Sequence, residues 1–317
     1  PPPPLVPPPR LSSEEDEDEE DILPARKQPP PPPPPLPRST SLTTSTNDPG
    51  EELLSGAGLP RITGPAEESF KRISCELAGV VQRGQKDPMD IAKFPGGEPI
   101  LLESSNLEEL SQRKYLVTWR PGGVRCLLLI LAKGVILITK SMAVRQVPEM
   151  HFPCRKKPGA LLDGTVLDGH VVLDKEPASG GKPGGTVRRF LAADILAVRG
   201  HTLTTEPLER RLQILQNEVI LARKQDTTHD YGKEVLRIRM RDYFKVNRVE
   251  YLLKTFRTQV THPFDGLVFS PVDQPYANSN STPNPMSRPL FWVPSKSDLT
   301  ESDLIGRCKQ LSSEWVS

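Results

Sequence analysis

Apolar residues recur three and four positions apart in several parts of the chain, and this period predicts amphipathic helices. Phe70, Ile73, Leu77 and Val80 follow it in the first of these segments. In a longer segment, Pro207 suits the first helical turn and a stripe of apolar residues follows it. The helices are expected over residues 69–82, 106–113, 207–223 and 246–256.

Short apolar runs between glycine, proline and polar turn residues predict strands in the rest of the chain. We expect residues 115–120, 125–131 and 135–139 to form three consecutive antiparallel strands joined by glycine turns. Over 236–241 apolar residues alternate with arginines, which predicts a strand with one basic face in water or, alternatively, against phosphates. Further strands are expected over 165–174, 187–196 and 266–270. This mixture is typical of an α+β domain with antiparallel sheets.

The first 65 residues differ in composition from the rest of the chain. They contain 19 of the 36 prolines, an acidic run from Glu14 to Asp21 and a polyproline run from Pro29 to Pro35. Such a segment buries too little apolar surface to offset its ordering entropy, so we expect disorder with stretches of polyproline II. The polyproline run is a candidate ligand for SH3 or WW domains, although such runs are more often passive spacers.

Three regions follow from this composition. We expect a disordered acidic and proline-rich linker over 1–65, a folded domain over 66–300, and a tail or the start of a further domain over 301–317. Charge divides at the same boundary, because residues 1–65 carry 5 Lys or Arg against 11 Asp or Glu and the remainder carries 36 against 29. A mildly basic domain is compatible with a phosphate-bearing partner but is also typical of an ordinary solvated surface.

Cysteines, histidines and hydropathy exclude several classes of protein. The four cysteines are widely spaced, which favours reduced thiols inside the cell. The five histidines lack zinc-finger spacing, so a metal site built from them is not expected. No apolar run approaches the roughly 18 residues of a membrane span, so no membrane partner is expected.

The segment from Tyr115 to Arg125, with the sequence Y-L-V-T-W-R-P-G-G-V-R, combines a short strand with a Gly-Gly turn. It resembles the acceptor motif of eukaryotic mRNA capping guanylyltransferases, in which a V-x-W strand ends in K-x-D-G-x-R and the lysine attacks the α-phosphate of GTP. Other segments match this family in order and approximate spacing. They are F-P-G-G-E-P at 94–99, H-F-P-C-R at 151–155, T-V-L-D-G-H at 165–170, R-F-L-A-A-D-I at 189–195, F-D-G-L-V-F at 264–269 and L-F-W-V-P at 290–294.

The resemblance implies which positions correspond to the chemical groups of the family, and several of these are changed. The nucleophilic lysine is Arg120, whose guanidinium stays protonated and offers no lone pair for a covalent lysyl-GMP. The acidic residue of the same motif is Gly122, and the glutamate of a later strand is His170. The two lysines that steady the triphosphate in the family are Phe291 and Val293 here.

Other positions of the same motifs are kept. The resemblance implies a ribose contact for Arg125 and nucleotide contacts for Asp168, Phe190 and Asp265, with Asp265 near a divalent metal. The alternative is that the aspartates serve turns and strand ends and that Arg125 pairs with one of them. Since the glycines and apolar residues of these strands are retained, the sequence predicts a folded domain without a competent catalytic set.

The resemblance implies the nucleotidyltransferase fold of capping enzymes and of the DNA ligase adenylation domain, with antiparallel sheets and flanking helices. The favoured function is an inactive guanylyltransferase-like protein of mRNA 5′ capping that binds a nucleotide, an RNA 5′ end or a capping or transcription protein. No cofactor is required, and GTP with Mg²⁺ binds only if some nucleotide binding is retained. The alternatives are an active guanylyltransferase with a relocated lysine, among Lys114, Lys133 and Lys140, and a purely structural interaction module. The resemblance implies the nucleus as location, with the cytosol as the alternative.

Overall fold

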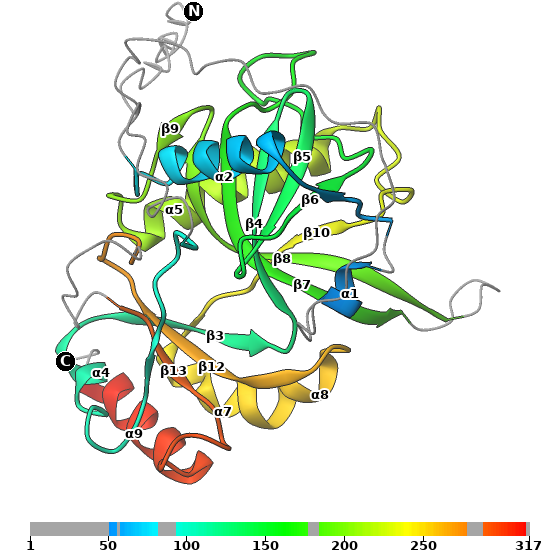
Figure 1. Ribbon diagram of the computed structural model, residues 1–317. Helices are drawn as coiled ribbons and strands as arrows, with labels where there is room; N and C mark the ends of the chain where they lie inside the picture. The colour runs from blue at the N-terminus through cyan, green and yellow to red at the C-terminus, as the bar shows by residue number, and fades with distance from the viewer. Residues whose placement is uncertain (1–50, 56–57, 82–92, 177–183, 278–287, 315–317) are drawn as a thin grey trace, which may run out of the picture.

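The computed structural model describes residues 51–55, 58–81, 93–176, 184–277 and 288–314. These residues form two β-sheets with helices packed against them (Figure 1). The predicted α+β class with mainly antiparallel sheets is confirmed. The expected disorder of residues 1–50 lies outside the described residues. None of the described helices combines the length and the apolar character that a membrane crossing requires.

The larger sheet has eight strands and occupies the upper part of the molecule in Figure 1. Its strands follow the order β1-β6-β5-β4-β7-β8-β10, and β9 pairs with the end of β8. Neighbouring strands are antiparallel except β10, which runs parallel to β8. The strands are β1 (Arg61–Ile62), β4 (Val124–Leu131), β5 (Gly134–Thr139), β6 (Val144–Val147), β7 (Thr165–Glu176), β8 (Gly185–Val198), β9 (His201–Thr202) and β10 (Arg237–Met240).

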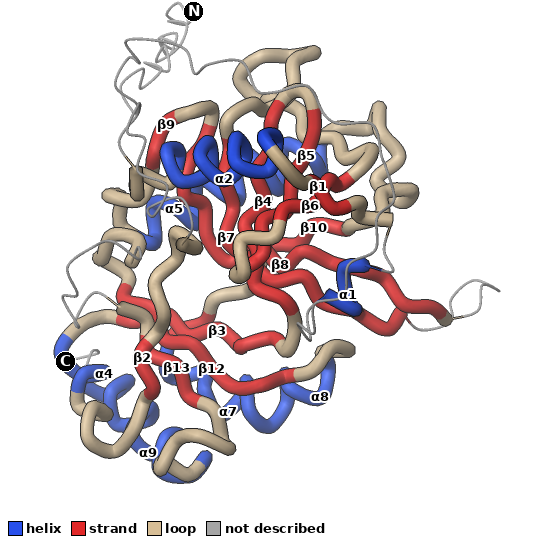
Figure 2. The backbone as a smooth tube through the Cα atoms, viewed as in Figure 1, coloured by secondary structure: helices blue, strands red, loops and turns tan. Residues whose placement is uncertain are grey.

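The smaller sheet has five strands and lies below the larger one in Figure 2. Its strands follow the order β11-β3-β12-β13-β2. The central strand β12 pairs antiparallel with both β3 and β13. The strands are β2 (Ile100–Leu101), β3 (Tyr115–Pro121), β11 (Phe244–Lys245), β12 (Phe264–Pro271) and β13 (Leu290–Trp292).

Both faces of the larger sheet are covered, which explains the unbroken apolar run of β4. Leu127 packs in one core with Phe70 of α2 (Pro65–Leu77), whereas Leu128 packs in a second core with Leu215 of the helical segment 208–225.

The helices are α1 (Glu51–Ser55), α2 (Pro65–Leu77), α4 (Glu109–Gln112), α5 (Leu208–Ile214), a π-helical stretch (Leu215–Leu221), α6 (Ala222–Gln225), a 3-10 turn (Val246–Arg248), α7 (Val249–Tyr251), a second π-helical stretch (Leu252–Phe256), α8 (Arg257–Gln259) and α9 (Glu301–Glu314).

The chain crosses from the smaller to the larger sheet between β3 and β4. The expectation that residues 115–120 and 125–131 are paired neighbours is therefore wrong. Gly122 and Gly123 imitate the signal of a tight hairpin, but the Gly122 N–H donates to the Pro263 carbonyl at 2.8 Å. A Cβ atom at Gly123 would lie 2.4 Å from the Val171 carbonyl oxygen, so only glycine fits this passage between the sheets. We call it the first crossing.

A second crossing leads from β10 into β11, through residues 241–243. β10 adds to the larger sheet beside β8, and β11 then pairs with β3 of the smaller sheet. The predicted basic face of this segment fits Arg239, which is exposed, but not Arg241, which is only 6% exposed. Arg241 lies where the chain leaves the larger sheet: its backbone N–H donates to the Ala192 carbonyl of β8 at 2.8 Å, and its Nη1 donates to the Trp119 carbonyl of β3 at 3.2 Å.

The folded region begins earlier and ends later than expected. Leu54 and Ile62 are buried in the cores of the larger sheet, so residues 51–65 belong in part to the domain rather than to the linker. Residues 301–314 form α9, and Leu304 packs in the core of the smaller sheet, so this segment is not a tail. Composition misplaces both boundaries because a few buried leucines and isoleucines are enough to fix a short polar segment to a larger core.

A buried hydrogen-bond chain through His262 joins the two sheets. Trp119 Nε1 of β3 donates to His262 Nε2 at 3.0 Å, and His262 Nδ1 lies 2.6 Å from Asp174 Oδ1 of β7. Since an indole N–H only donates, the imidazole carries its proton on Nδ1 and donates it to the carboxylate. The ring therefore ties the smaller sheet to the larger one.

Replacing His262 with alanine is expected to lower the free energy of unfolding by about 2–3 kcal/mol, because a buried indole N–H and a buried carboxylate lose a partner. Denaturant unfolding measures this change. His201→Ala is the control, since the His201 ring makes none of the hydrogen bonds found among the described residues, and we expect it to cost less than about 1 kcal/mol. Equal losses in the two variants would show that His262 acts only by filling space.

Candidate functional site

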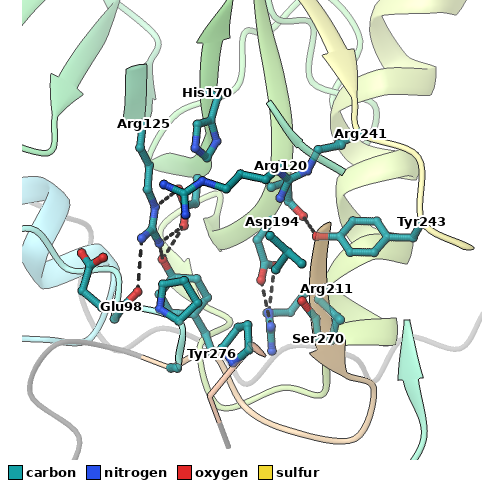
Figure 3. Close-up of a pocket in the computed structure, with 18 of the residues that line it drawn as sticks. Glu98, Arg120, Arg125, His170, Asp194, Arg211, Arg241, Tyr243, Ser270 and Tyr276 are labelled. Atoms are coloured by element: carbon teal, nitrogen blue, oxygen red, sulfur yellow. Dashed lines mark hydrogen bonds and ion pairs between the residues drawn. The ribbon is translucent and has the colours of Figure 1, made fainter. Parts of the chain in front are cut away.

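A pocket of about 350 Å³ opens where the two sheets meet (Figure 3). Known small-molecule sites occupy about 300–1,000 Å³, so the pocket has the size of a ligand site. Both crossings contribute to it, because Arg120 lies at the end of β3 and Arg241 directly follows β10. The other charged and hydrogen-bonding side chains of its lining are Glu98, Arg125, Lys140, Asp168, His170, Asp194, Arg211, Tyr243, Ser270, Gln274 and Tyr276.

Arg125 and Asp168 form a buried ion pair on the neighbouring strands β4 and β7. Arg125 Nε and Nη2 donate to the two carboxylate oxygens at 3.2 and 2.7 Å. The Tyr276 hydroxyl donates to Asp168 Oδ2 at 2.6 Å, and Arg125 Nη1 donates to the Gly97 carbonyl at 3.2 Å. Burial raises the pKa of Asp168, but Arg125 and Tyr276 outweigh it and hold this pKa below its usual range. Both oxygens of the retained aspartate are therefore engaged within the protein.

Asp194 and Arg211 form a second buried pair on the other side of Tyr276. Arg211 Nε and Nη2 each donate to an Asp194 oxygen at 2.8 Å. The Arg211 guanidinium also lies 5.7 Å from the centre of the Tyr276 ring. Each aspartate of the pocket therefore has its own arginine, and the pocket offers few carboxylate oxygens to a ligand.

Arg120 and Arg241 face the pocket without a carboxylate partner among the described residues. The Arg120 guanidinium lies 5.1 Å from the centre of the Phe291 ring, a cation–π contact. Arg241 Nη1 donates to the Trp119 carbonyl at 3.2 Å, whereas its Nε is buried without a hydrogen-bond partner. In Figure 3 both side chains lie near His170.

His170 is the neutral polar group among these cations. Burial, followed by the positive charges of Arg241 and Arg125, lowers its pKa well below the ordinary value, so the imidazole carries no charge near neutral pH. Its Nδ1 is buried and has no hydrogen-bond partner. The position that the resemblance assigns to a glutamate therefore holds an uncharged ring with an unused nitrogen.

Of the lysines considered as relocated nucleophiles, only Lys140 is among the described residues that line the pocket. Its ammonium pairs with Glu98 at 2.8 Å, and the two side chains are 57% and 60% exposed. Lys114 and Lys133 are exposed and lie outside the lining. Among the described lysines, Lys140 is therefore the one that could act in this pocket.

Phe190, Phe291 and Val293 do not line the pocket. Phe190 pairs with Val171 across β7 and β8 and packs in the apolar core with Leu215. The predicted nucleotide contact of Phe190 is therefore not supported, because strand alternation turns its side chain to the opposite face of the sheet. Phe291 reaches the site only through Arg120, and Val293 is buried.

A divalent metal finds no suitable ligands in the part of the chain that the structure describes. These residues contain no group of three or more His, Cys, Asp or Glu side chains that could hold an ion. Asp265 is exposed beside Gly122, outside the pocket lining, and the oxygens of Asp168 are already engaged. The residues present therefore do not fit the metal that the resemblance places near Asp265.

Sequence patterns miss several residues of the pocket. Arg211 had a usable signal, because it lies on the same helical face as Leu208, Leu212 and Leu215, and a charge on a buried face requires a partner. Tyr243 and Tyr276 follow strands in irregular segments, where no hydrophobic period applies. Their role depends on contacts between segments far apart in the sequence.

The chain matches a family model described as mRNA capping enzyme, catalytic domain, over residues 63–283. It is similar to the mRNA-capping enzyme of Danio rerio, with 31% identity over 201 residues, which are 61% of this chain and 33% of that protein. It is also similar to the mRNA-capping enzyme subunit alpha of Candida glabrata, with 27% identity over 263 residues, 74% of this chain and 57% of that protein. This chain thus spans between a third and somewhat more than half of these relatives. A mycobacterial DNA ligase D complexed with ATP and MES aligns with a TM-score of 0.36 and 14% identity, over 64% of this chain and 60% of that one.

Proposed function

We propose, from the premise that this chain belongs to the mRNA capping enzyme catalytic domain family, that it acts in mRNA 5′ capping as a binding protein and does not itself transfer GMP. The ligand is a nucleotide, an RNA 5′ end or another protein of the capping or transcription machinery. The nucleus is the proposed location.

The observation that carries this proposal is the guanidinium of Arg120 at the acceptor position, inside the pocket. Covalent nucleotidyl transfer to a side chain requires a nitrogen with an available lone pair. A guanidinium keeps its proton in proteins. Arg120 can therefore attract a phosphate but cannot attack one.

Two further features support binding without transfer. The positions of the triphosphate lysines hold Phe291 and Val293, and neither lines the pocket. Charge that develops during phosphoryl transfer would have to be stabilised by preorganised cations, which usually supply the largest catalytic contribution. The carboxylates that could hold a metal are engaged by Arg125 and Arg211.

A second candidate function has one observation in its favour. Lys140 lines the pocket, so an active guanylyltransferase with a relocated nucleophile would use it. The Lys140 side chain is engaged in an ion pair with Glu98 at 2.8 Å, and both side chains are more than half exposed at the edge of the pocket. We therefore place this candidate second.

The proposal is tested by incubating the purified protein with α-labelled GTP and a divalent metal, and by measuring label that survives denaturation. We expect no adduct, because the acceptor position has no nucleophile. Arg120→Lys is expected to remain unlabelled as well, since the triphosphate cations and the metal ligands are also missing.

Two lysine variants distinguish the candidates if label appears. An adduct that is lost in Lys140→Arg but persists in Lys133→Arg would establish the relocated nucleophile and refute binding without transfer. Lys133 is the matched control because it lies outside the pocket lining. Labelling of Arg120→Lys alone would show that the arginine is the single cause of inactivity.

A further inference from the structure

Three neighbouring groups of the pocket keep hydrogen-bonding capacity that the described residues do not use. The half-buried Arg120 guanidinium makes only the ring contact with Phe291 among the described residues. Arg241, 6% exposed, keeps a buried Nε without a partner, and His170 keeps a buried Nδ1 without a partner. More than nine-tenths of buried polar groups in proteins are hydrogen-bonded, so two unpaired buried nitrogens beside the half-buried Arg120 guanidinium indicate a missing ligand.

The charged side chains of the lining indicate the sign of the charge that this ligand carries. Five cationic side chains face three carboxylates in the pocket. Three of the cations are paired, in Arg125–Asp168, Lys140–Glu98 and Arg211–Asp194. Arg120 and Arg241 remain as two positive charges without a carboxylate partner among the described residues. A buried cation is costly unless an anion accompanies it, so the site favours an anion with about two negative charges.

We infer that Arg120, Arg241 and His170 form an oxyanion site that holds one phosphate group, carried as a phosphate monoester, within the pocket. The inference deepens the proposed function, on which it rests, by naming the chemical class that the pocket binds. A phosphate monoester carries about 1.5 to 2 negative charges at neutral pH and presents three acceptor oxygens. Two guanidinium forks and one imidazole N–H match those oxygens in number and in donor character.

The contact between Arg120 and Phe291 supports a single phosphate rather than a triphosphate. Phe291 replaces a cation of the family and supplies a ring face under the Arg120 guanidinium, 5.1 Å from its centre. The ring positions Arg120 within the site but cannot hold a second phosphate. No described set of carboxylates is available for a metal that would offset the charge of a longer phosphate chain.

Isothermal titration at fixed ionic strength tests the site, with inorganic phosphate as the first probe. We expect wild-type protein to bind phosphate and Arg120→Met to bind it about tenfold or more weakly, because a charge-assisted hydrogen-bonding partner is lost. Arg241→Met is the second variant, with its folding checked by circular dichroism. Arg239→Met is the matched control, because Arg239 is exposed on β10 and pairs with Asp242 outside the pocket.

Two oligoribonucleotides that differ only in a 5′-monophosphate or a 5′-hydroxyl distinguish the sources of the phosphate. Tighter binding of the 5′-phosphorylated strand, lost in Arg120→Met, would identify an RNA end as the source. Phosphate binding without this preference would identify a free phosphate or a mononucleotide. Equal binding of both strands and no effect of Arg120→Met on inorganic phosphate would overturn the inference.

The test separates this inference from the proposed function. A covalent GMP adduct refutes binding without transfer, whatever the phosphate titrations give. The absence of both adduct and phosphate binding refutes the oxyanion site alone and leaves binding of a protein partner as the use of the pocket. Inorganic phosphate that binds wild type and Arg120→Met equally would place the anion elsewhere on the protein.

Discussion

Replacing Gly266 with alanine is expected to prevent folding or to lower the free energy of unfolding by more than about 4 kcal/mol. Gly266 lies in β12 with a φ of +155°, and a Cβ atom there would lie 2.0 Å from the Trp292 carbonyl oxygen. That oxygen belongs to β13, so relief of the clash would separate two strands at the centre of the smaller sheet. Soluble yield, circular dichroism and denaturant unfolding measure the effect.

The same substitution at Gly306 is the control and is expected to act in the opposite direction. Gly306 lies in α9, is exposed, and a Cβ atom there would meet nothing within 4 Å. Alanine in a helix interior is favoured over glycine by about 0.5–1 kcal/mol, so Gly306→Ala should raise the free energy of unfolding by that amount. A Gly266→Ala protein as stable as wild type would show that the strand pairing described for β12 and β13 is incorrect.

Replacing Asp168 with alanine is expected to lower the free energy of unfolding by about 3–5 kcal/mol, because it leaves the mostly buried Arg125 guanidinium without its carboxylate. The Asp168 side chain is 7% exposed and that of Arg125 is 20% exposed, so water compensates little. Denaturant unfolding at neutral pH measures the loss. Glu98→Ala breaks the exposed pair with Lys140 in the same pocket and is expected to cost about 0–1 kcal/mol.

The effect of Asp168→Ala should depend on pH on the acid side. Because the pKa of Asp168 in the folded protein lies below the unfolded value of about 3.9, its contribution to stability is complete above that pH. The contribution is lost as the pH falls through the lower, folded pKa, so wild type and variant should converge in strong acid. Parallel pH profiles, or equal losses in Asp168→Ala and Glu98→Ala, would show that the Arg125–Asp168 pair contributes nothing.

Much of the fold follows from local sequence patterns. The α+β class with antiparallel sheets and flanking helices is confirmed, and so is the relation to the nucleotidyltransferases of mRNA capping. The predicted strands 165–174 and 187–196 correspond to β7 and β8, which pair antiparallel in the larger sheet. The helix predicted over 207–223 corresponds to the helical segment 208–225.

The assignment of strands to sheets could not be obtained in this way. Residues 115–120 and 125–131 carry the pattern of a hairpin, yet Gly122 and Gly123 lead from one sheet into the other. The pairing partners of β3 are β11 and β12, which lie more than a hundred residues later in the sequence. Local periodicity reports which side chains are buried but not which strand lies next to them.

The candidate site was predictable to a similar extent. Arg120, Arg125, Asp168 and His170 were identified from motifs, and the structure brings all four into one pocket. The proposed anion site depends also on Arg241, whose alternating pattern predicts a face in water or against phosphates but not the burial that the structure shows. Its burial results from the second crossing, which no local pattern reveals.

The two crossings link ligand binding in the pocket to the stability of the fold. Arg120 adjoins one covalent link between the sheets and Arg241 begins another, so an anion bound by both would hold the two sheets together at the pocket. A ligand that binds only the folded state stabilises it by about 2.7 kcal/mol at a hundred times its dissociation constant. The melting temperature of this protein should therefore rank small phosphate-bearing compounds directly, and a search for its physiological ligand needs no assay of turnover.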